Sequence, residues 1–272
     1  MDTVVLLLLI TFPVAALLFG LYSIFNDFYK YFAEEVRYWI KIRQPISKDH
    51  LRILKKYCAY YNRLDTSQKP EFERKIQRFM YSKRFIARSV PVVTAEMRVL
   101  ISASAIQLTF ALPGIYLSNF DKILIYADSY YSQITKKYHL GEVNPRAGMI
   151  ILSWHHFVQG YGDLDDGYNV AIHEMAHAIH FENLIKNDEV AFLDQHALSS
   201  LAQITNRELP KINRGRHLLR SYAGTNQYEF FAVTLEYFFE KPVELNAEIP
   251  DLYQTIAALL RQDPLKLYNF SN

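Results

Sequence analysis

Hydrophobic and polar positions divide the chain into an apolar start and a longer part with mixed periodicities. Residues 4–25, VVLLLLITFPVAALLFGLYSIF, carry no charge. Patterned or apolar stretches typical of helices follow at Asp27–Ile42, Ser47–Leu64, Gln68–Phe85 and Thr94–Phe110. Short aliphatic runs predict strands at Leu124–Ala127 and Met149–Trp154, and Ile86–Val93 reads as extended. The layout predicts an α+β fold in which helices predominate.

The apolar N-terminal run is long enough to cross a bilayer, because at 1.5 Å per residue it spans about 33 Å. A cleaved signal peptide would begin with basic residues, whereas the charged side chain nearby is Asp2 and no A-x-A site follows. Lysines and arginines follow the run and none precedes it, which predicts a cytoplasmic location for the rest of the chain. We therefore expect a single-pass membrane anchor over residues 1–26, a juxtamembrane helix and linker over residues 27–46, and a folded domain over residues 47–272.

The stretch 169–180, NVAIHEMAHAIH, contains the pattern His-Glu-x-x-His. Residues four apart share one face of a helix, so His173 and His177 can both reach a single Zn²⁺ at about 2.0–2.1 Å. Glu174 is rotated by about 100° and lies beside the metal, where it can accept a proton from a metal-bound water. The alternative is a surface helix with two unrelated histidines. Apolar or small residues surround the polar triplet, however, and a buried helix must pair or ligate its polar groups, which favours zinc.

A catalytic zinc usually has three protein ligands and one open position. The single cysteine, Cys58, excludes a site built on cysteines and any intramolecular disulfide. The stretch Ser221–Pro242 predicts a helix that is capped by Asn226 and carries Glu229 and Glu236 two turns apart on one face. A carboxylate among phenylalanines needs a partner, and a bound cation is the strongest available. Periodicity alone leaves Glu229 and Glu236 equally eligible.

Composition adds two constraints. Half of the residues are apolar, so the chain is a folded protein and not a disordered one. The formal charge of +2 argues against a nucleic-acid partner, which would require a concentrated basic patch.

Several longer segments resemble one known family. They are PEFERKIQRFMYSKRF, VTAEMRVLISASAIQLTF, SW at residues 153–154, DGYNVAIHEMAH, YAGTNQYEFFAVTLEYFFEKP, and PDLYQ followed by QDPLKLY. In this order they resemble the Mlc titration factor A family of zinc-dependent peptidases, over residues from about 50 to 268. The resemblance implies a zincin-like metallopeptidase domain of the gluzincin type with a small sheet. Its catalytic core is expected to be similar to that of the anthrax lethal factor peptidase domain.

The resemblance also implies roles for individual residues. One zinc ion per chain is expected to be bound by His173, His177 and Glu229, with Glu174 as general base. Glu229 is favoured over Glu236 because it occupies the position just before the Phe-Ala-Val segment that supplies the ligand in the family. Tyr222 lies seven residues before Glu229, as a transition-state-stabilising tyrosine does in lethal factor.

Three ligands and an adjacent glutamate predict an open catalytic site that hydrolyses peptide bonds, with a peptide or an unfolded protein as substrate. Met149–Trp154 is the strand expected to form an edge beside the cleft, where an extended peptide could pair with it. The alternative is a binding protein that sequesters a transcriptional regulator, an activity recorded in the family's name, with a structural or vestigial zinc site. A closed structural site would need a fourth ligand. A membrane-tethered scaffold with a degenerate site is disfavoured, because all motif residues are present.

Overall fold

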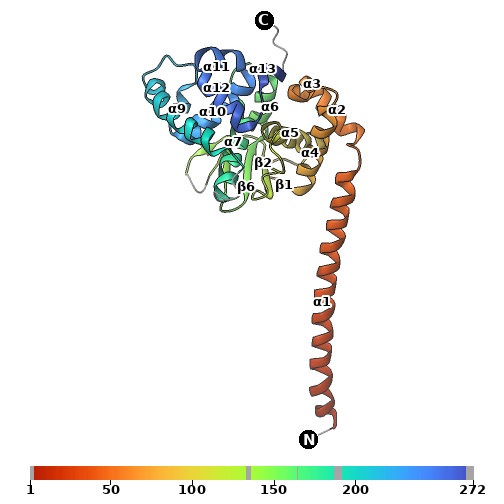
Figure 1. Ribbon diagram of the computed structural model, residues 1–272. Coiled ribbons are helices and arrows are strands. Elements are labelled where there is room, and N and C mark those ends of the chain that lie inside the picture. Colours follow the sequence, from red (N-terminus) through yellow and green to blue (C-terminus); the bar gives the residue numbers. More distant parts are fainter. Residues whose placement is uncertain (1–2, 133–135, 164, 187–191, 268–272) are drawn as a thin grey trace. The chain divides into compact units, whose positions relative to one another are not determined.

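The computed structural model describes residues 3–132, 136–163, 165–186 and 192–267. The chain divides into two units, Met1–Pro45 and Ile46–Asn272. The first unit contains helix α1 (Thr3–Arg43), in which the backbone continues as one helix through the predicted anchor and the predicted juxtamembrane segment (Figure 1). Within α1, the side chains of residues 3–11, 13–17, 27, 30, 31 and 34 lie outside the described part of the structure.

The predicted membrane anchor, residues 1–26, therefore falls largely on side chains outside the described residues. Among the residues that are described, no helix is both long enough and apolar enough to cross a membrane. The transmembrane helix has no support in the structure and rests on the sequence alone.

The second unit contains a four-stranded sheet in the order β1–β2–β6–β5. Its strands are β1 (Arg84–Ala87), β2 (Lys122–Tyr126), β6 (Met149–Ser153) and β5 (Gly141–Asn144). The first three are parallel, and β5 runs antiparallel to β6. A separate two-stranded ribbon pairs β3 (Tyr130–Tyr131) with β4 (Tyr138–His139). The small mixed sheet among many helices confirms the predicted α+β class with helices predominating.

The prediction of an edge strand at Met149–Trp154 is wrong. The strand β6 lies between β2 and β5, so both of its sides are paired, and Trp154 begins the next helix. The edge strands of this sheet are β1 and β5. The one next to β6 is β5, in which Gly141 lies opposite Leu152 and Asn144 opposite Met149. Its sequence, Gly-Glu-Val-Asn, is short and lacks hydrophobic alternation, so the pairing with β6 defines it more than its own composition does.

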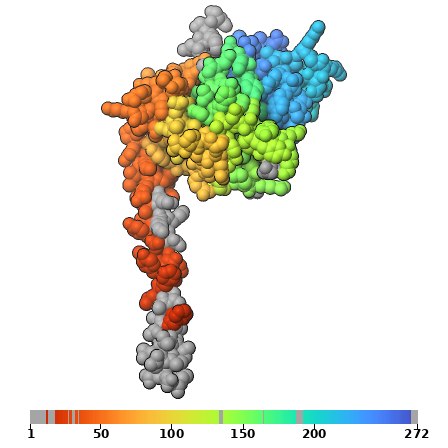
Figure 2. All heavy atoms as spheres, turned by 180° about the vertical axis from the view of Figure 1, so that it is seen from behind, coloured from red at the N-terminus to blue at the C-terminus, as the bar shows by residue number. Residues whose placement is uncertain are grey.

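Helices make up most of the second unit (Figure 1). Those in the described part of the chain are α2 (Lys48–Tyr57), α3 (Ala59–Arg63), α4 (Gln68–Ser82), α5 (Ala95–Thr109), α6 (Trp154–Gly162), α7 (Val170–Ile185), α9 (Gln195–Asn213), the 3-10 turn η1 (Ser221–Gly224), α10 (Gln227–Glu240), α11 (Pro242–Glu248), α12 (Pro250–Leu260) and α13 (Pro264–Leu267). Helix α5 packs against both α2 and α4. In the view from behind, the orange and yellow parts of the chain lie next to each other (Figure 2).

Two predicted helices end earlier than the sequence suggested. The helix expected over Ser47–Leu64 is divided at Cys58, whose backbone is extended with ψ 95°. The helix expected over Gln68–Phe85 ends at Ser82, and Phe85 belongs to β1. Burial of both residues is compatible with either conformation, so the apolar pattern could not locate these boundaries.

Helix α7 is buried on nearly every side, because it packs against α5, α10, β5 and β6. Its apolar residues are accordingly not confined to one stripe. The helix begins after Asn169, whose side-chain oxygen accepts a hydrogen bond from the backbone N–H of Ile172 at 3.0 Å. This packing carries the His-Glu-x-x-His segment into the interior, against the edge strand and α10.

Candidate metal centre

The structure brings three of the predicted site side chains together. His173 and His177 lie on α7 and Glu229 lies in the first turn of α10, and one ligand atom from each falls within 4.8 Å of the others. The Nε2 atoms of the two histidines are 3.2 Å apart. Oε2 of Glu229 lies 3.0 Å from Nε2 of His173 and 3.5 Å from Nε2 of His177. These three side chains converge on one point, as the spacing of the two histidines predicted.

The position of Glu229 follows from the start of α10. The side-chain oxygen of Asn226 accepts hydrogen bonds from the backbone N–H groups of Tyr228 at 2.8 Å and of Glu229 at 3.0 Å. Oε2 of Glu229 is buried, and although the Nε2 atoms of both histidines lie near it, it forms no hydrogen bond of regular geometry with any residue that the structure describes. A buried carboxylate oxygen is costly without a partner, and a cation between it and two imidazoles supplies one. The residues present therefore fit a metal ion.

The charges of the site residues in the metal-free protein also favour a bound cation. Burial raises the pKa of the Glu229 carboxyl, but the imidazoles of His173 and His177 outweigh burial and hold that pKa well below its ordinary value. Burial lowers the pKa of His173, but Glu229 and Glu236 outweigh it and raise the pKa to about 10. Without a metal the carboxylate is thus paired with a protonated imidazole. A metal ion that binds here displaces this proton, so binding weakens as the pH falls.

Glu174 lies beside the three converging side chains and contacts the edge strand. A Cβ atom built on Gly141 of β5 would lie 2.4 Å from Cγ of Glu174, so the Glu174 side chain rests directly against the glycine backbone. Burial raises the pKa of the Glu174 carboxyl above its ordinary value, and the charges of His173 and His177 act in the opposite direction. A carboxyl group poised in this way can both accept and release a proton.

Tyr222 lies in η1 and is half-exposed, with its ring centroid 5.9 Å from that of His173. Burial and then the charges of Glu229 and Glu174 raise the pKa of its phenol to about 12. The hydroxyl therefore keeps its proton at neutral pH and remains a hydrogen-bond donor.

Glu236, the other carboxylate that periodicity made eligible, is not one of the converging side chains. Its Oε1 lies 2.7 Å from Nδ1 of His173, on the opposite edge of the imidazole. The cation that this buried carboxylate requires is Arg220, whose guanidinium donates to both of its oxygens, at 2.7 and 3.0 Å. Sequence reasoning missed Arg220. The signal was a carboxylate among phenylalanines, but local spacing does not reveal which distant cation pairs with it.

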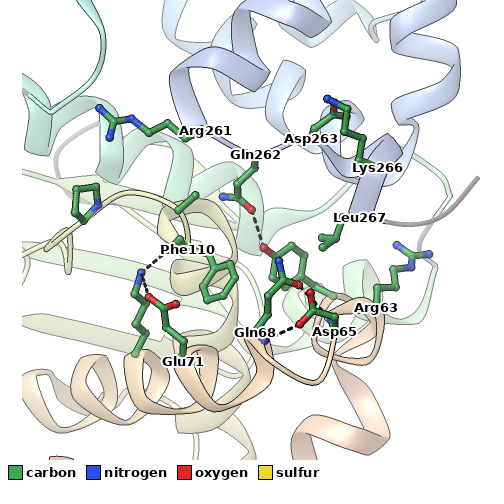
Figure 3. Close-up of a pocket in the computed structure, with 14 residues that line it drawn as sticks. Arg63, Asp65, Gln68, Glu71, Phe110, Arg261, Gln262, Asp263, Lys266 and Leu267 are labelled. Carbon is green, nitrogen blue, oxygen red and sulfur yellow. Dashed lines mark hydrogen bonds and ion pairs between the residues drawn. The ribbon is translucent and has the colours of Figure 1, made fainter.

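A cavity of about 390 Å³ opens onto the metal centre. Its lining comes from the segment of β4 and β5, from the loop before α7, and from α7, η1 and α10. The lining residues are Tyr138, His139, Leu140, Gly141, Tyr168, Val170, His173, Glu174, Arg220, Tyr222 and Glu236. A larger cavity of about 680 Å³ lies between α3, α4 and the C-terminal helices (Figure 3). There Lys75 pairs with Glu71, and Tyr60 donates a hydrogen bond to Gln262. None of the three converging side chains lines this larger cavity. The cavity beside the metal centre is therefore the candidate site for catalysis.

Comparison with known proteins places the chain in a family. The model of the glucose-regulated metallo-peptidase family M90 matches residues 33–261. An uncharacterized protein of Synechocystis is 30% identical over 239 residues, which cover 82% of this chain and 87% of the relative. Mlc titration factor A of Pectobacterium atrosepticum is 29% identical over 210 residues, which cover 69% and 76% of the two chains.

Mlc titration factor A of Yersinia pestis is likewise 29% identical, over 221 residues that cover 72% of this chain and 79% of the relative. These matches confirm the resemblance that the longer sequence segments indicated. The chain belongs to the M90 family of glucose-regulated metallopeptidases.

Proposed function

We propose that this protein is a zinc-dependent peptidase in which His173, His177 and Glu229 bind one zinc ion. The observation that carries the proposal is the convergence of two imidazole nitrogens and one buried carboxylate oxygen on a single point. A tetrahedral zinc at about 2.1 Å from each ligand atom requires ligand atoms about 3.4 Å apart. The separations of 3.0, 3.2 and 3.5 Å are close to that value. Two imidazoles and one carboxylate without a thiolate also suit zinc.

The residues around this site can carry out peptide hydrolysis. A bound zinc supplies a Lewis acid that acidifies water and polarises the scissile carbonyl. Glu174 accepts the proton of the attacking water as the new C–O bond forms, and then delivers that proton to the leaving amine as the C–N bond breaks. Tyr222, protonated at neutral pH, donates a hydrogen bond to the oxyanion that develops on the carbonyl.

The substrate class follows from the edge strand. Among the strands that the structure describes, β5 pairs only with β6, and it borders the cavity through Gly141. An extended peptide can add to such an edge by main-chain hydrogen bonds, whereas a folded protein cannot offer a free strand. We infer that the substrates are peptides or unfolded protein segments that lie along β5, with the scissile bond beside Glu174.

A second candidate function comes from the names of the relatives. Two of them are called Mlc titration factor A, which describes an action on the regulator Mlc. Binding of a transcriptional regulator of this kind is the alternative role for this chain, with the zinc site then serving structure. If the protein is a peptidase, its zinc-loaded form should cleave unstructured peptides. If it only binds a regulator, the zinc-loaded form should leave them intact.

For location we propose, from the sequence alone, that residues 4–25 anchor the chain in a membrane with the second unit in the cytoplasm. The basis is the uncharged run and the lysines and arginines that follow it. Carbonate extraction of the full-length chain should leave it in the membrane pellet, and deletion of residues 1–26 should release it. Recovery of the full-length chain in the soluble fraction would contradict the anchor.

The experiment for the peptidase uses the full-length protein and a panel of unstructured peptides. Zinc-loaded protein should cleave members of the panel, chelation should abolish cleavage, and added zinc should restore it. A zinc-loaded protein that cleaves nothing, yet binds a regulator tightly, would replace the peptidase by the sequestration role.

A further inference from the structure

Arg220 lies just before η1 and contacts several parts of the site at once. Its guanidinium donates from Nη1 to Oε2 of Glu236 at 3.0 Å and from Nη2 to Oε1 at 2.7 Å. Nη1 also donates to the backbone carbonyl of Gly167 at 2.7 Å. The guanidinium carbon lies 4.7 Å from the ring centroid of Tyr168 and 6.0 Å from that of Tyr222. One side chain therefore contacts α10, the loop before α7 and two rings of the cavity lining.

Glu236 connects Arg220 to the metal-binding histidine His173 by hydrogen bonds. Its side chain is fully buried, and both of its oxygens are shared. Oε1 lies between Arg220 and Nδ1 of His173, at 2.7 Å from each. Oε2 accepts hydrogen bonds from Arg220 and, at 2.6 Å, from the backbone N–H of Asn169, the residue that caps α7. The ring of His173 is thus fixed at Nδ1, which leaves Nε2 directed at Glu229 and His177.

We propose that Arg220 is a positioning residue, which orients His173 for the metal through Glu236 and holds Tyr222 beside it through a cation–π contact. The inference rests on the proposed zinc site. It assigns to Arg220 a function that the converging ligands alone do not reveal. The rim of the cavity and the ligand geometry are then set by one side chain, so a change at Arg220 affects both.

The forked guanidinium of Arg220 is what a lysine at this position could not replace. Arginine donates two parallel hydrogen bonds to one carboxylate and stacks on aromatic rings, and lysine does neither in this geometry. Without the guanidinium, Glu236 keeps His173 and Asn169 as partners but loses the two bonds that fix its rotation. The imidazole is then free to turn with the carboxylate. Loss of such an outer partner of a metal-binding histidine typically weakens metal binding by about 10–100-fold.

The test measures zinc affinity in the full-length protein by competition with a chromogenic chelator. Arg220→Met should weaken zinc binding by about 10–100-fold, and Arg220→Lys, which keeps the charge but not the fork, should weaken it less. Glu236→Gln should give a loss similar to that of Arg220→Met. Because the two side chains act as one unit, the double variant should lose no more than the worse single variant.

The matched control is Arg207→Met. Arg207 also forms a bidentate pair, with Asp251 at 2.7 and 3.0 Å, and contacts buried Glu208. None of its hydrogen bonds or ion pairs within the described part of the chain reaches the metal centre. This variant should lower the melting temperature and leave the zinc affinity unchanged. Circular dichroism identifies the variants that fold, and zinc affinity is compared only among these. If Arg220→Met does not fold, Arg220→Lys takes its place in the comparison.

The outcomes separate this inference from the proposed function. Wild-type zinc affinity in folded Arg220→Lys and Arg220→Met proteins, or losses that multiply in the double variant, would overturn the positioning role. Failure of the wild-type protein itself to bind zinc would instead overturn the proposed function. Equal losses in Arg207→Met and Arg220→Met would also contradict the inference, since they would reflect a general loss of stability.

Discussion

The contact between Gly141 and Glu174 allows a substitution that moves the proposed general base without replacing a metal ligand. A methyl group at Gly141 would lie 2.4 Å from Cγ, 2.5 Å from Cδ and 2.5 Å from Oε1 of Glu174. Ordinary contacts between such atoms are about 3.5–4.0 Å. In Gly141→Ala, therefore, either the side chain of Glu174 or the edge strand must move by about 1 Å.

A displacement of this size is large for a group that transfers a proton. A misplacement of about 1 Å can cost about 10²-fold in rate, and we expect a loss of that order in kcat for peptide hydrolysis. Zinc affinity should change little, because the three atoms nearest to the new methyl group all belong to Glu174 and none to His173, His177 or Glu229. The strand pairing of Gly141 with Leu152 uses backbone atoms only and should persist.

The assay compares kcat and bound zinc in Gly141→Ala and in the control variant Gly162→Ala. Gly162 ends α6, and a Cβ atom there would meet nothing within 4 Å. The control should keep wild-type turnover. Retention of wild-type kcat by a folded, zinc-loaded Gly141→Ala protein would refute the placement of Glu174 as the base.

Three further predictions concern the buried carboxylates and the metal. Burial raises the pKa of Glu240 to about 8 from an ordinary value of 4.5, so the folded chain holds a proton that the unfolded chain releases as the pH rises between these values. The free energy of unfolding then falls over this range; in zinc-free protein, Glu240→Gln should match the wild type at pH 4 and exceed it at pH 9 in denaturant titrations. Glu229→Ala should weaken zinc binding more than Glu236→Ala, and the reverse order in chelator competition would make Glu236 the ligand. Free zinc at one hundred times its Kd should raise the free energy of unfolding of the wild type by about 2.7 kcal/mol in calorimetry, and a chelator should remove this gain.

Features that local sequence determines could be predicted. Thr94 and Asn226 are caps whose side chains accept hydrogen bonds from the first turns of α5 and α10, and they mark these starts in the sequence. The strands β2 and β6 are aliphatic runs, because both faces of a parallel strand are covered. The meeting of His173 and His177 follows from helical spacing alone.

Features that depend on pairing between distant segments could not be predicted. The edge strand β5 has no pattern of its own, and the pairing of Gly141 with Leu152 gives it a register. The pairing of Arg220 with Glu236 joins η1 to α10. Periodicity placed Glu229 and Glu236 on one face of a helix, but only the packing of α10 against α7 brings one to Nε2 and the other to Nδ1 of the same histidine.

The central claim is that Glu174 takes the proton of the attacking water in a zinc-dependent peptidase. The most direct measurement is kcat/KM for an unstructured peptide in zinc-loaded wild type and Glu174→Gln, with bound zinc determined in the same samples. Glutamine has nearly the same shape but cannot accept the proton at neutral pH, so hydrolysis should fall by about 10²-fold or more while zinc content stays at one per chain. Undiminished hydrolysis by zinc-loaded Glu174→Gln protein would contradict the account.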